Sequence, residues 1–179
     1  MPVVGLHIDV QHAGESGGEA VLERLSVAFE RTGEELRDFS THVWPKLTPV
    51  FEAEERRQFD AQGGGPRGEW APLTDAYARR KELLYPGNPI LVASGALKAA
   101  LTESSSPFAT RAYSGQQFEF GTSGLEYASY HQVGTERMVA RPPFDFSDDF
   151  ERDVTEAALE AAREAMASSG LDELVEVVP

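Results

Sequence analysis

Histidine and carboxylate side chains are the first candidates for chemistry in this sequence. His7 and Asp9 stand two residues apart, so on a strand both would face the same side, as two ligands of one metal ion do. Zinc sites in proteins use about three or four ligands, and no third candidate lies near this pair. His12 and His42 stand alone and fit ordinary surface or half-buried positions. The pattern therefore favours a polar strand face over a metal site.

His131 is the best candidate for a general base, because Ser129 lies two residues before it. A serine nucleophile needs the imidazole within hydrogen-bond reach, and α/β-hydrolases carry this serine on a strand–turn–helix elbow. Ser129 follows no such strand. We therefore predict that the chain has no catalytic residue and is not an enzyme. A hydrolase that uses His131 or carboxylates stays an alternative.

Four glycines, at positions 63, 64, 65 and 68, are the candidates for cradling a phosphate. A phosphate-binding loop of the Walker type needs a preceding strand and a Gly-Lys-Ser/Thr sequence after its spacer. Here Arg67-Gly68-Glu69-Trp70 follows, and the residues before the glycines have helical spacing. The glycines therefore predict a hinge or a surface loop, and no cofactor is expected.

Charged residues are abundant, and their balance argues against a nucleic-acid-binding surface. The 179 residues include 30 acidic and 16 basic ones, a formal net charge of −14, whereas proteins that grip nucleic acid concentrate Lys and Arg. The small basic cluster Arg79-Arg80-Lys81 lies near Tyr77, and ion pairs with the many acids are the better interpretation. Glu156, Glu160 and Glu164 recur at four-residue spacing, which predicts a solvated or channel-facing helix face.

Composition excludes several other classes of protein. The sequence contains no cysteine, so disulfides, thiolate catalysis and cysteine-ligated metal sites are excluded. The first residues lack a basic region followed by an apolar stretch, so we expect no signal peptide. A membrane span would need a run of about 18 apolar residues, and none is present. Hydrophobic residues make up 41% of the chain, enough for a single domain over residues 1–179.

Strand and helix patterns mix without strict alternation, which predicts an α+β fold: a small antiparallel sheet packed with several helices. Residues 3–10 alternate as a half-buried strand does, and a long N-terminal helical region follows over residues 21–43. A second helical stretch runs over residues 47–61, and Pro45 and Pro49 are expected to kink or break the chain there.

Shorter elements follow, separated by Gly and Pro clusters. In chain order we expect an irregular loop over residues 62–69, a helix capped by Thr74 and ending at Leu84, a helix over 91–101, a hairpin over 108–121, a short helix or turn over 125–133, an extended segment over 138–146, and a long helix that Ser147 or Asp148 caps and Gly170 ends. The loop 62–69 and the C-terminal tail 171–179 should be flexible or dock on a partner.

Five short pieces between Phe59 and Phe144 stand in a distinctive order and spacing. They are Phe59 before the glycine loop, Trp70-Ala71-Pro72-Leu73 followed by Thr74 and Lys81, Ile90-Leu91 followed by Ser94-Gly95-Ala96-Leu97, Tyr127-Ala128 followed by His131-Gln132 and Gly134, and Arg141-Pro142-Pro143-Phe144. Together they resemble the bacteriophage virion-morphogenesis family, also called the tail-completion family. The resemblance covers about half of the chain and leaves out the N-terminal strand and the last helix.

The residues that carry the resemblance are expected to be structural, either packed in the core or placed at subunit contacts. They are Phe59, Trp70, Pro72, Leu73, Thr74, Lys81, Leu91, Gly95, Leu97, Tyr127, His131, Gln132, Gly134, Arg141 and Phe144. Trp70 and Leu73 would anchor the loop on the core, and Gly95 would allow close packing or a tight turn.

The resemblance implies a structural virion protein that completes the tail of a tailed phage and joins it to the head. The implied partners are further copies of the chain in a ring, a hexamer by tail symmetry, with a head-side connector or stopper protein and a tail terminator or tail tube protein. Double-stranded DNA would pass through the ring without specific binding, because acidic subunits repel phosphates. The implied location is the neck or tail end of the virion, after synthesis in the host cytoplasm, and no metal, cofactor or membrane is involved. A transient assembly factor that leaves the finished particle is the alternative.

Overall fold

The computed structural model describes Val27, residues 30–31, 33–34, 37, 39–115 and 117–169. The strand predicted over residues 3–10, most of the helix predicted over 21–43, Gly170 and the tail 171–179 lie outside the described residues, as do His7, Asp9 and His12. The described part consists of helices and two small antiparallel sheets, which confirms the α+β prediction.

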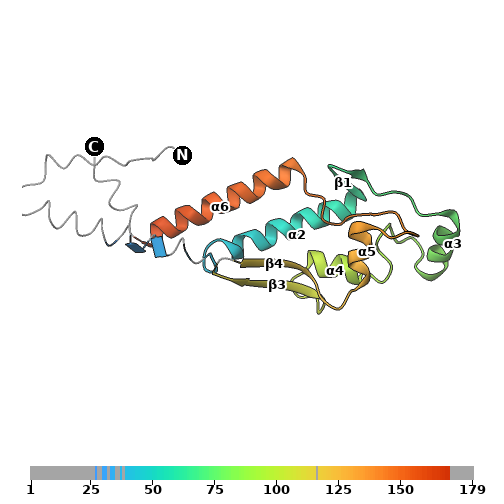
Figure 1. Ribbon diagram of the computed structural model, residues 1–179, viewed down its shortest axis with the longest axis horizontal. Helices are drawn as coiled ribbons and strands as arrows, with labels where there is room; N and C mark the ends of the chain where they lie inside the picture. The colour runs from blue at the N-terminus through green and yellow to red at the C-terminus, as the bar shows by residue number, and fades with distance from the viewer. Residues whose placement is uncertain are drawn as a thin grey trace, which may run out of the picture.

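The elements keep the labels of Figure 1. In chain order they are α2 (Trp44–Ala61), β1 (Gly63–Gly65), β2 (Gly68–Glu69), α3 (Asp75–Leu84), α4 (Ala96–Thr102), β3 (Ala109–Ser114), β4 (Gln117–Thr122), α5 (Tyr127–Val133) and α6 (Asp148–Ser168). Helix α2 runs through the middle, with α6 along one side and the β3–β4 hairpin and α4 on the other (Figure 1).

Two prolines lie in α2 without breaking it. Pro45 is in the first turn, where a missing N–H leaves no helical bond unmade, so the helix begins there. Pro49 lies inside the helix, so of the kink or break expected there, the break does not occur. Contacts from outside hold this end in place, because the Trp44 indole donates to the Ser114 carbonyl (2.8 Å) and stacks on Phe118 with ring centres 5.6 Å apart.

The hairpin predicted over residues 108–121 is confirmed, with β3 and β4 paired antiparallel. Phe118 and Phe120 are two residues apart in β4, so both face α2. There the ring of Phe51 lies 5.3 Å from Phe118, 5.0 Å from Phe120 and 4.9 Å from Phe150 of α6. This aromatic cluster joins the hairpin, the central helix and the last helix.

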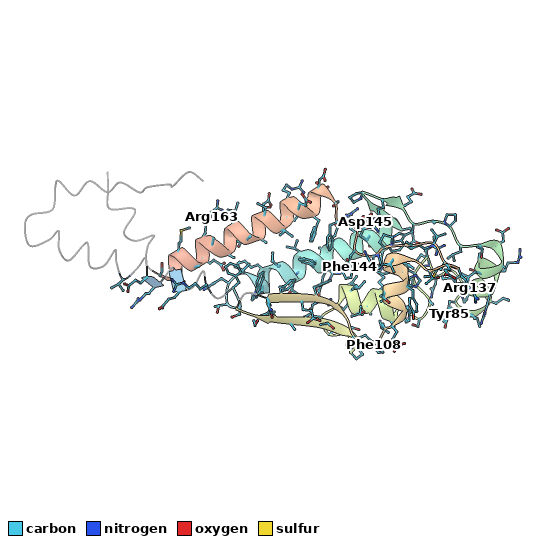
Figure 2. The ribbon with its side chains drawn as sticks, viewed as in Figure 1. Tyr85, Phe108, Arg137, Phe144, Asp145 and Arg163 are labelled. Atoms are coloured by element: carbon cyan, nitrogen blue, oxygen red, sulfur yellow. The ribbon has the colours of Figure 1, made fainter. Side chains whose placement is uncertain are left out.

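The glycines after α2 form regular structure, so the prediction of an irregular loop over 62–69 is wrong. β1 pairs antiparallel with β2. Gly65 lies against the chain just before α6, and a Cβ at this residue would stand 2.0 Å from the Asp145 carbonyl oxygen. The Arg67 N–H donates to the Asp145 carboxylate (2.9 Å), and Figure 2 shows Asp145 at the β1 end of α2. The missing side chains thus serve backbone packing.

The helix predicted over residues 91–101 begins only at Ala96. Leu91 (φ 61°) and Gly95 (φ 85°) hold left-handed conformations, which interrupt helical geometry before that point. α3 begins after Thr74 as predicted, although the Thr74 side chain makes no capping hydrogen bond.

The last helix, α6, begins where the sequence predicts. The Ser147 hydroxyl accepts a hydrogen bond from the Phe150 N–H (3.2 Å) and caps it. Glu160 and Glu164 are exposed as predicted, and both also contact Lys46 of α2, at 3.3 and 2.8 Å. Among the described residues no helix is long and apolar enough to cross a membrane.

Helix α2 buries two adjacent carboxylates in opposite surroundings. Glu54 is hydrogen-bonded by Arg57 (2.7 and 2.8 Å) and by Gln58 (3.2 Å). Burial acts to raise the pKa of Glu54, but these bonds outweigh it and the pKa is lowered. Glu55 is fully buried and both its carboxylate oxygens lack a hydrogen-bond partner. Burial, with the neighbouring Glu54 charge, holds the pKa of Glu55 well above its ordinary range.

Candidate functional site: a pocket between α3, α4 and α5

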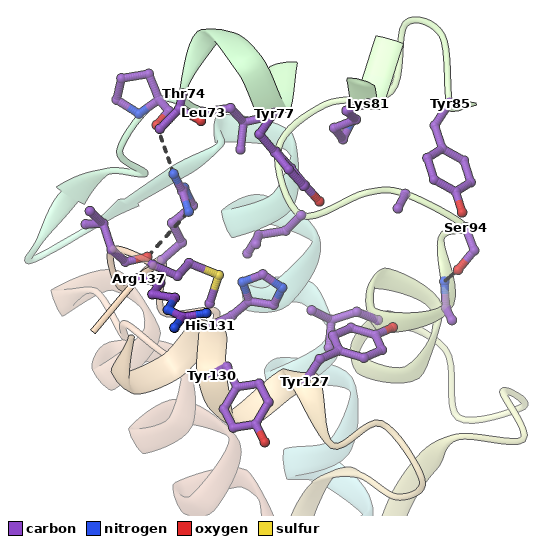
Figure 3. Close-up of a pocket in the computed structure, with 18 of the residues that line it drawn as sticks. Leu73, Thr74, Tyr77, Lys81, Tyr85, Ser94, Tyr127, Tyr130, His131 and Arg137 are labelled. Atoms are coloured by element: carbon purple, nitrogen blue, oxygen red, sulfur yellow. Dashed lines mark hydrogen bonds between the residues drawn. The ribbon is translucent and has the colours of Figure 1, made fainter. Parts of the chain in front are cut away.

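A pocket of about 700 Å³ lies between α3, α4, α5 and the chain that follows α5. Cavities that bury small ligands usually measure roughly 300–1,000 Å³. Tyr77 and Lys81 come from α3, Leu97 from α4, and Tyr127 and His131 from α5 (Figure 3). The remaining lining residues are Pro72, Leu73, Thr74, Tyr85, Leu91, Ala93, Ser94, Gly95, Ala96, Tyr130, Arg137, Met138, Val139 and Arg141.

The pocket adjoins the hydrophobic core through Leu97, which belongs to both. Phe59, Trp70, Leu97 and Leu101 are buried together there. The Phe59 and Trp70 rings meet edge to face with centres 5.3 Å apart, and the Trp70 indole donates to the Pro142 carbonyl (3.0 Å). The buried polar atom of Trp70 is therefore satisfied, and the same bond ties the segment before α6 to the core.

Arg141 fixes one wall of the pocket. Its guanidinium is buried and donates to the carbonyls of Ala71 (2.6 Å) and Pro72 (2.8 Å). The backbone N–H of Arg141 donates to the His131 carbonyl (2.8 Å). The side chain of Arg141 thereby links the segment before α6 to the segment before α3, and its backbone N–H adds the link to α5. Such a planar fork suits two carbonyls at fixed spacing, which a lysine cannot match.

We expect Arg141→Lys to lower the free energy of unfolding by about 1–3 kcal/mol, because at least one buried carbonyl loses its donor. Chemical denaturation followed by fluorescence measures the change. Arg163→Lys, at an exposed position of α6, is the matched control and should leave the stability unchanged. Equal midpoints for the two variants would contradict the role given to Arg141.

Gln132 and Gly134 hold the chain that turns back from α5. The Gln132 amide donates to the Phe144 carbonyl (2.9 Å) and accepts from the Phe144 N–H (3.1 Å). Gly134 has a φ of 78°, and a Cβ there would stand 3.0 Å from the Ala140 nitrogen and the Met138 carbonyl oxygen. Only a glycine fits this turn without displacing the backbone.

Lys81 is buried and points away from solvent, and its ammonium donates to the Asn88 carbonyl. The Asn88 amide donates in turn to the Ala93 carbonyl (2.8 Å), so the loop after α3 is held against the pocket. Arg79 and Arg80 are exposed. None of the three basic residues forms an ion pair within the described ranges, so the interpretation of this cluster as ion pairs is wrong.

His131 stands at the centre of the pocket, but without a catalytic partner. Its ring meets Tyr127 edge to face (6.0 Å), and its Nδ1 is buried with no hydrogen-bond partner. Burial, helped by the charge of Arg141, lowers the pKa of His131, so the ring is neutral at pH 7. The Ser129 hydroxyl donates to the Glu126 carbonyl (2.9 Å). The described residues therefore hold no Ser129–His131 pair.

Most of the residues singled out in the sequence meet at this pocket. Its lining includes Pro72, Leu73, Thr74, Lys81, Leu91, Gly95, Leu97, Tyr127, His131 and Arg141. Phe59 and Trp70 pack in the core with the lining residue Leu97, and Gln132, Gly134 and Phe144 hold the chain that turns back from α5. Sequence reasoning missed the contributions of Tyr77, Tyr85, Tyr130 and Arg137. Tyr77 could have been found, because it lies four residues before Lys81 on one face of a helix.

No group of three or more His, Asp or Glu side chains able to hold a metal ion occurs within the described ranges. The pair His7 and Asp9 lies outside them. Comparisons with known proteins found no matching family model, no matching curated protein and no matching solved structure.

Proposed function

We propose that the chain is a structural subunit of a tailed-phage neck or tail end, which completes the tail, joins it to the head and forms a ring around the DNA channel. The proposal begins from the resemblance of residues 59–144 to the tail-completion family. The observation that carries it is that ten residues from four of the five separate pieces line one pocket, and that Phe59, the fifth piece, packs in the core with Trp70 and the lining residue Leu97.

The bonds made by these residues support a structural role over a chemical one. Arg141, Trp70, Lys81 and Gln132 all donate to backbone carbonyls, and the bonds of Arg141 and Trp70 join segments that are far apart in the sequence. Side chains used in this way hold loops at fixed positions and offer no free nucleophile or base. A sequence pattern that preserves them would preserve the shape of a subunit.

The charge of the chain supports a conduit for DNA. A net charge of −14 repels phosphates, which would allow DNA to slide through a ring without sticking. The exposed carboxylates of α6, at Glu156, Glu160 and Glu164, are the best candidates for the channel face.

A phage with a nonsense codon early in the gene for this chain tests the proposal. Without suppression we expect DNA-filled heads and finished but unattached tails in electron micrographs, and joined particles when the chain is supplied from a plasmid. Quantitative mass spectrometry of purified wild-type virions should find the chain in a fixed number of copies. Joined particles made without the chain would contradict the proposal. A chain required for joining but missing from virions would identify a transient assembly factor instead.

A further inference from the structure

The pocket carries positive charge on a chain that is strongly acidic elsewhere. Lys81, Arg137 and Arg141 line it, and no Asp or Glu does, although the sequence holds 30 acidic residues. Lys81 and Arg141 are buried and bonded to backbone carbonyls. Arg137 is exposed at the rim and forms no ion pair within the described ranges. Its charge is therefore available to a ligand.

Aromatic and aliphatic surface faces the same opening. Tyr77, Tyr127 and Tyr130 are 53%, 41% and 51% exposed, and Val139 is 63% exposed. Exposed apolar side chains gathered around a concave site are typical of binding surfaces. Together with Arg137 they fit a ligand that combines apolar side chains with negative charge, as an acidic, apolar peptide does.

The chain itself contains such a peptide. Residues 171–179 read Leu-Asp-Glu-Leu-Val-Glu-Val-Val-Pro, with three acidic residues, five Leu or Val residues and no basic one. Its charge is opposite to that of the pocket, and its aliphatic side chains match the tyrosine-lined wall. A nucleic-acid base stacked on a tyrosine is the competing occupant, but the net charge of −14 opposes the approach of a polyanion.

Geometry favours the pocket of a neighbouring copy over the pocket of the same copy. α6 has 21 residues, so it carries the chain about 30 Å away from Asp148. Arg163 on this helix and Arg137 at the pocket lie toward opposite ends of the described part (Figure 2). Residues 171–179 span at most about 30 Å when fully extended. A segment of that length, returning along α6, reaches only the start of the helix and falls short of the pocket.

We propose that residues 171–179 of one copy bind in the pocket of the next copy, with their carboxylates facing Arg137 and their Leu and Val side chains against Tyr77 and Tyr130. The contact is head-to-tail, because the two surfaces that meet are different. Repetition of such a contact closes a ring or extends a filament. Closure into a ring rests on the proposed function, whereas the contact between copies does not.

Photo-cross-linking of the full chain tests the contact. We place p-benzoylphenylalanine at position 77 and irradiate an equal mixture of ¹⁴N- and ¹⁵N-labelled copies. Residues 164–179 contain no Lys or Arg, so the tryptic peptide that begins at Glu164 carries residues 171–179 intact. We expect this peptide cross-linked to position 77, in pairs that mix the two isotopes. The same probe at Arg79, on the exposed side of α3, is the control and should not capture it.

A charge exchange tests the same contact without a probe. Arg137→Glu should weaken self-association about tenfold in analytical ultracentrifugation, because attraction becomes repulsion. Changing Asp172, Glu173 and Glu176 to Lys should weaken it as well, and the two sets combined should restore it. Arg79→Glu changes the net charge equally and should have no effect.

Cross-links from position 77 to another segment only, cross-links confined to one isotope, or equal effects of Arg137→Glu and Arg79→Glu would overturn the contact. These results are independent of the nonsense-mutant experiment. If joining needs the chain but no cross-link forms between copies, the proposed function stands and the docking is overturned. If copies cross-link but heads and tails join without the chain, the docking stands and the proposed function is overturned.

Discussion

Gly65→Ala lowers the free energy of unfolding by about 3 kcal/mol or more, an expectation that follows from how closely Asp145 approaches the glycine. A Cβ at residue 65 would stand 2.0 Å from the Asp145 carbonyl oxygen and 2.6 Å from one of its carboxylate oxygens. Both atoms belong to Asp145, which is held in place because the Gln58 amide donates to the same carbonyl (2.5 Å) and the Arg67 N–H donates to the carboxylate (2.9 Å).

The measurement is urea denaturation followed by circular dichroism, with the unfolding midpoint and slope compared between variants. Gly121→Ala is the matched control, because Gly121 lies in a strand with no atom within 4 Å of the added Cβ and an ordinary backbone conformation. Its alanine variant should be equal in stability or slightly more stable, since alanine narrows the unfolded ensemble. If Gly65→Ala were as stable as Gly121→Ala, Asp145 would be able to move away from the added Cβ with little loss of stability.

Glu55→Gln raises the free energy of unfolding at pH 7 by about 1–3 kcal/mol, because the neutral amide removes the penalty of a buried carboxyl that must be protonated or left without a partner. Glu55 is fully buried, and its neighbouring charges are Glu54, which repels it, and Arg111, which attracts it. Burial is the stronger influence and raises the pKa of Glu55.

The pH dependence of this effect has a definite sign. The folded protein binds a proton at Glu55 that the unfolded chain releases above the ordinary pKa of 4.5. The contribution of Glu55 to stability is therefore fully present below pH 4.5 and is lost as the pH rises toward the raised pKa. The gain from Glu55→Gln should consequently be largest at neutral pH and shrink toward pH 4.5. Thermal denaturation across this range, for both chains, measures it.

Glu54→Gln provides the opposite case at the adjacent residue. The pKa of Glu54 is lowered overall, because its bonds from Arg57 and Gln58 outweigh burial, so its charged form stabilises the fold. That stabilisation is present above the ordinary pKa and lost as the pH falls. The Glu54 variant should therefore be less stable than the wild type at pH 7. If Glu54→Gln and Glu55→Gln changed the free energy of unfolding at pH 7 in the same direction, the opposite surroundings assigned to the two carboxylates would be wrong.

Local sequence patterns predicted much of the fold. Ser147 predicted the start of α6 because its hydroxyl can reach the N–H of Phe150, a contact three residues away. The hairpin was predictable because alternation puts Phe118 and Phe120 on one side. Other features depend on contacts between distant segments: the glycines at 63–65 form a strand that pairs with β2, and Gly65 lies against Asp145, a residue 80 positions later in the chain.

The pocket was predictable only in part, for a related reason. Order and spacing singled out Arg141 and His131, but nothing local to either residue indicates that the Arg141 N–H bonds the His131 carbonyl. The absence of carboxylates from the lining is likewise invisible in a sequence with 30 acidic residues. The buried state of Glu55 was missed because Glu55 stands in a run of charged residues, Glu54 to Arg57, whose composition is typical of a solvent-exposed helix face.

The packing of α2 against α6 has a consequence for how the protein folds during its synthesis. Phe51 meets Phe150 only after about a hundred further residues have been added, and synthesis proceeds at about 5–20 residues per second. The aromatic face of α2 thus waits roughly 5–20 seconds on the ribosome before its last cover arrives. During that interval, neighbouring nascent chains on the same messenger RNA expose the same aromatic surface and can aggregate through it. The expression yield will therefore depend on translation speed and on chaperones that cover aromatic side chains.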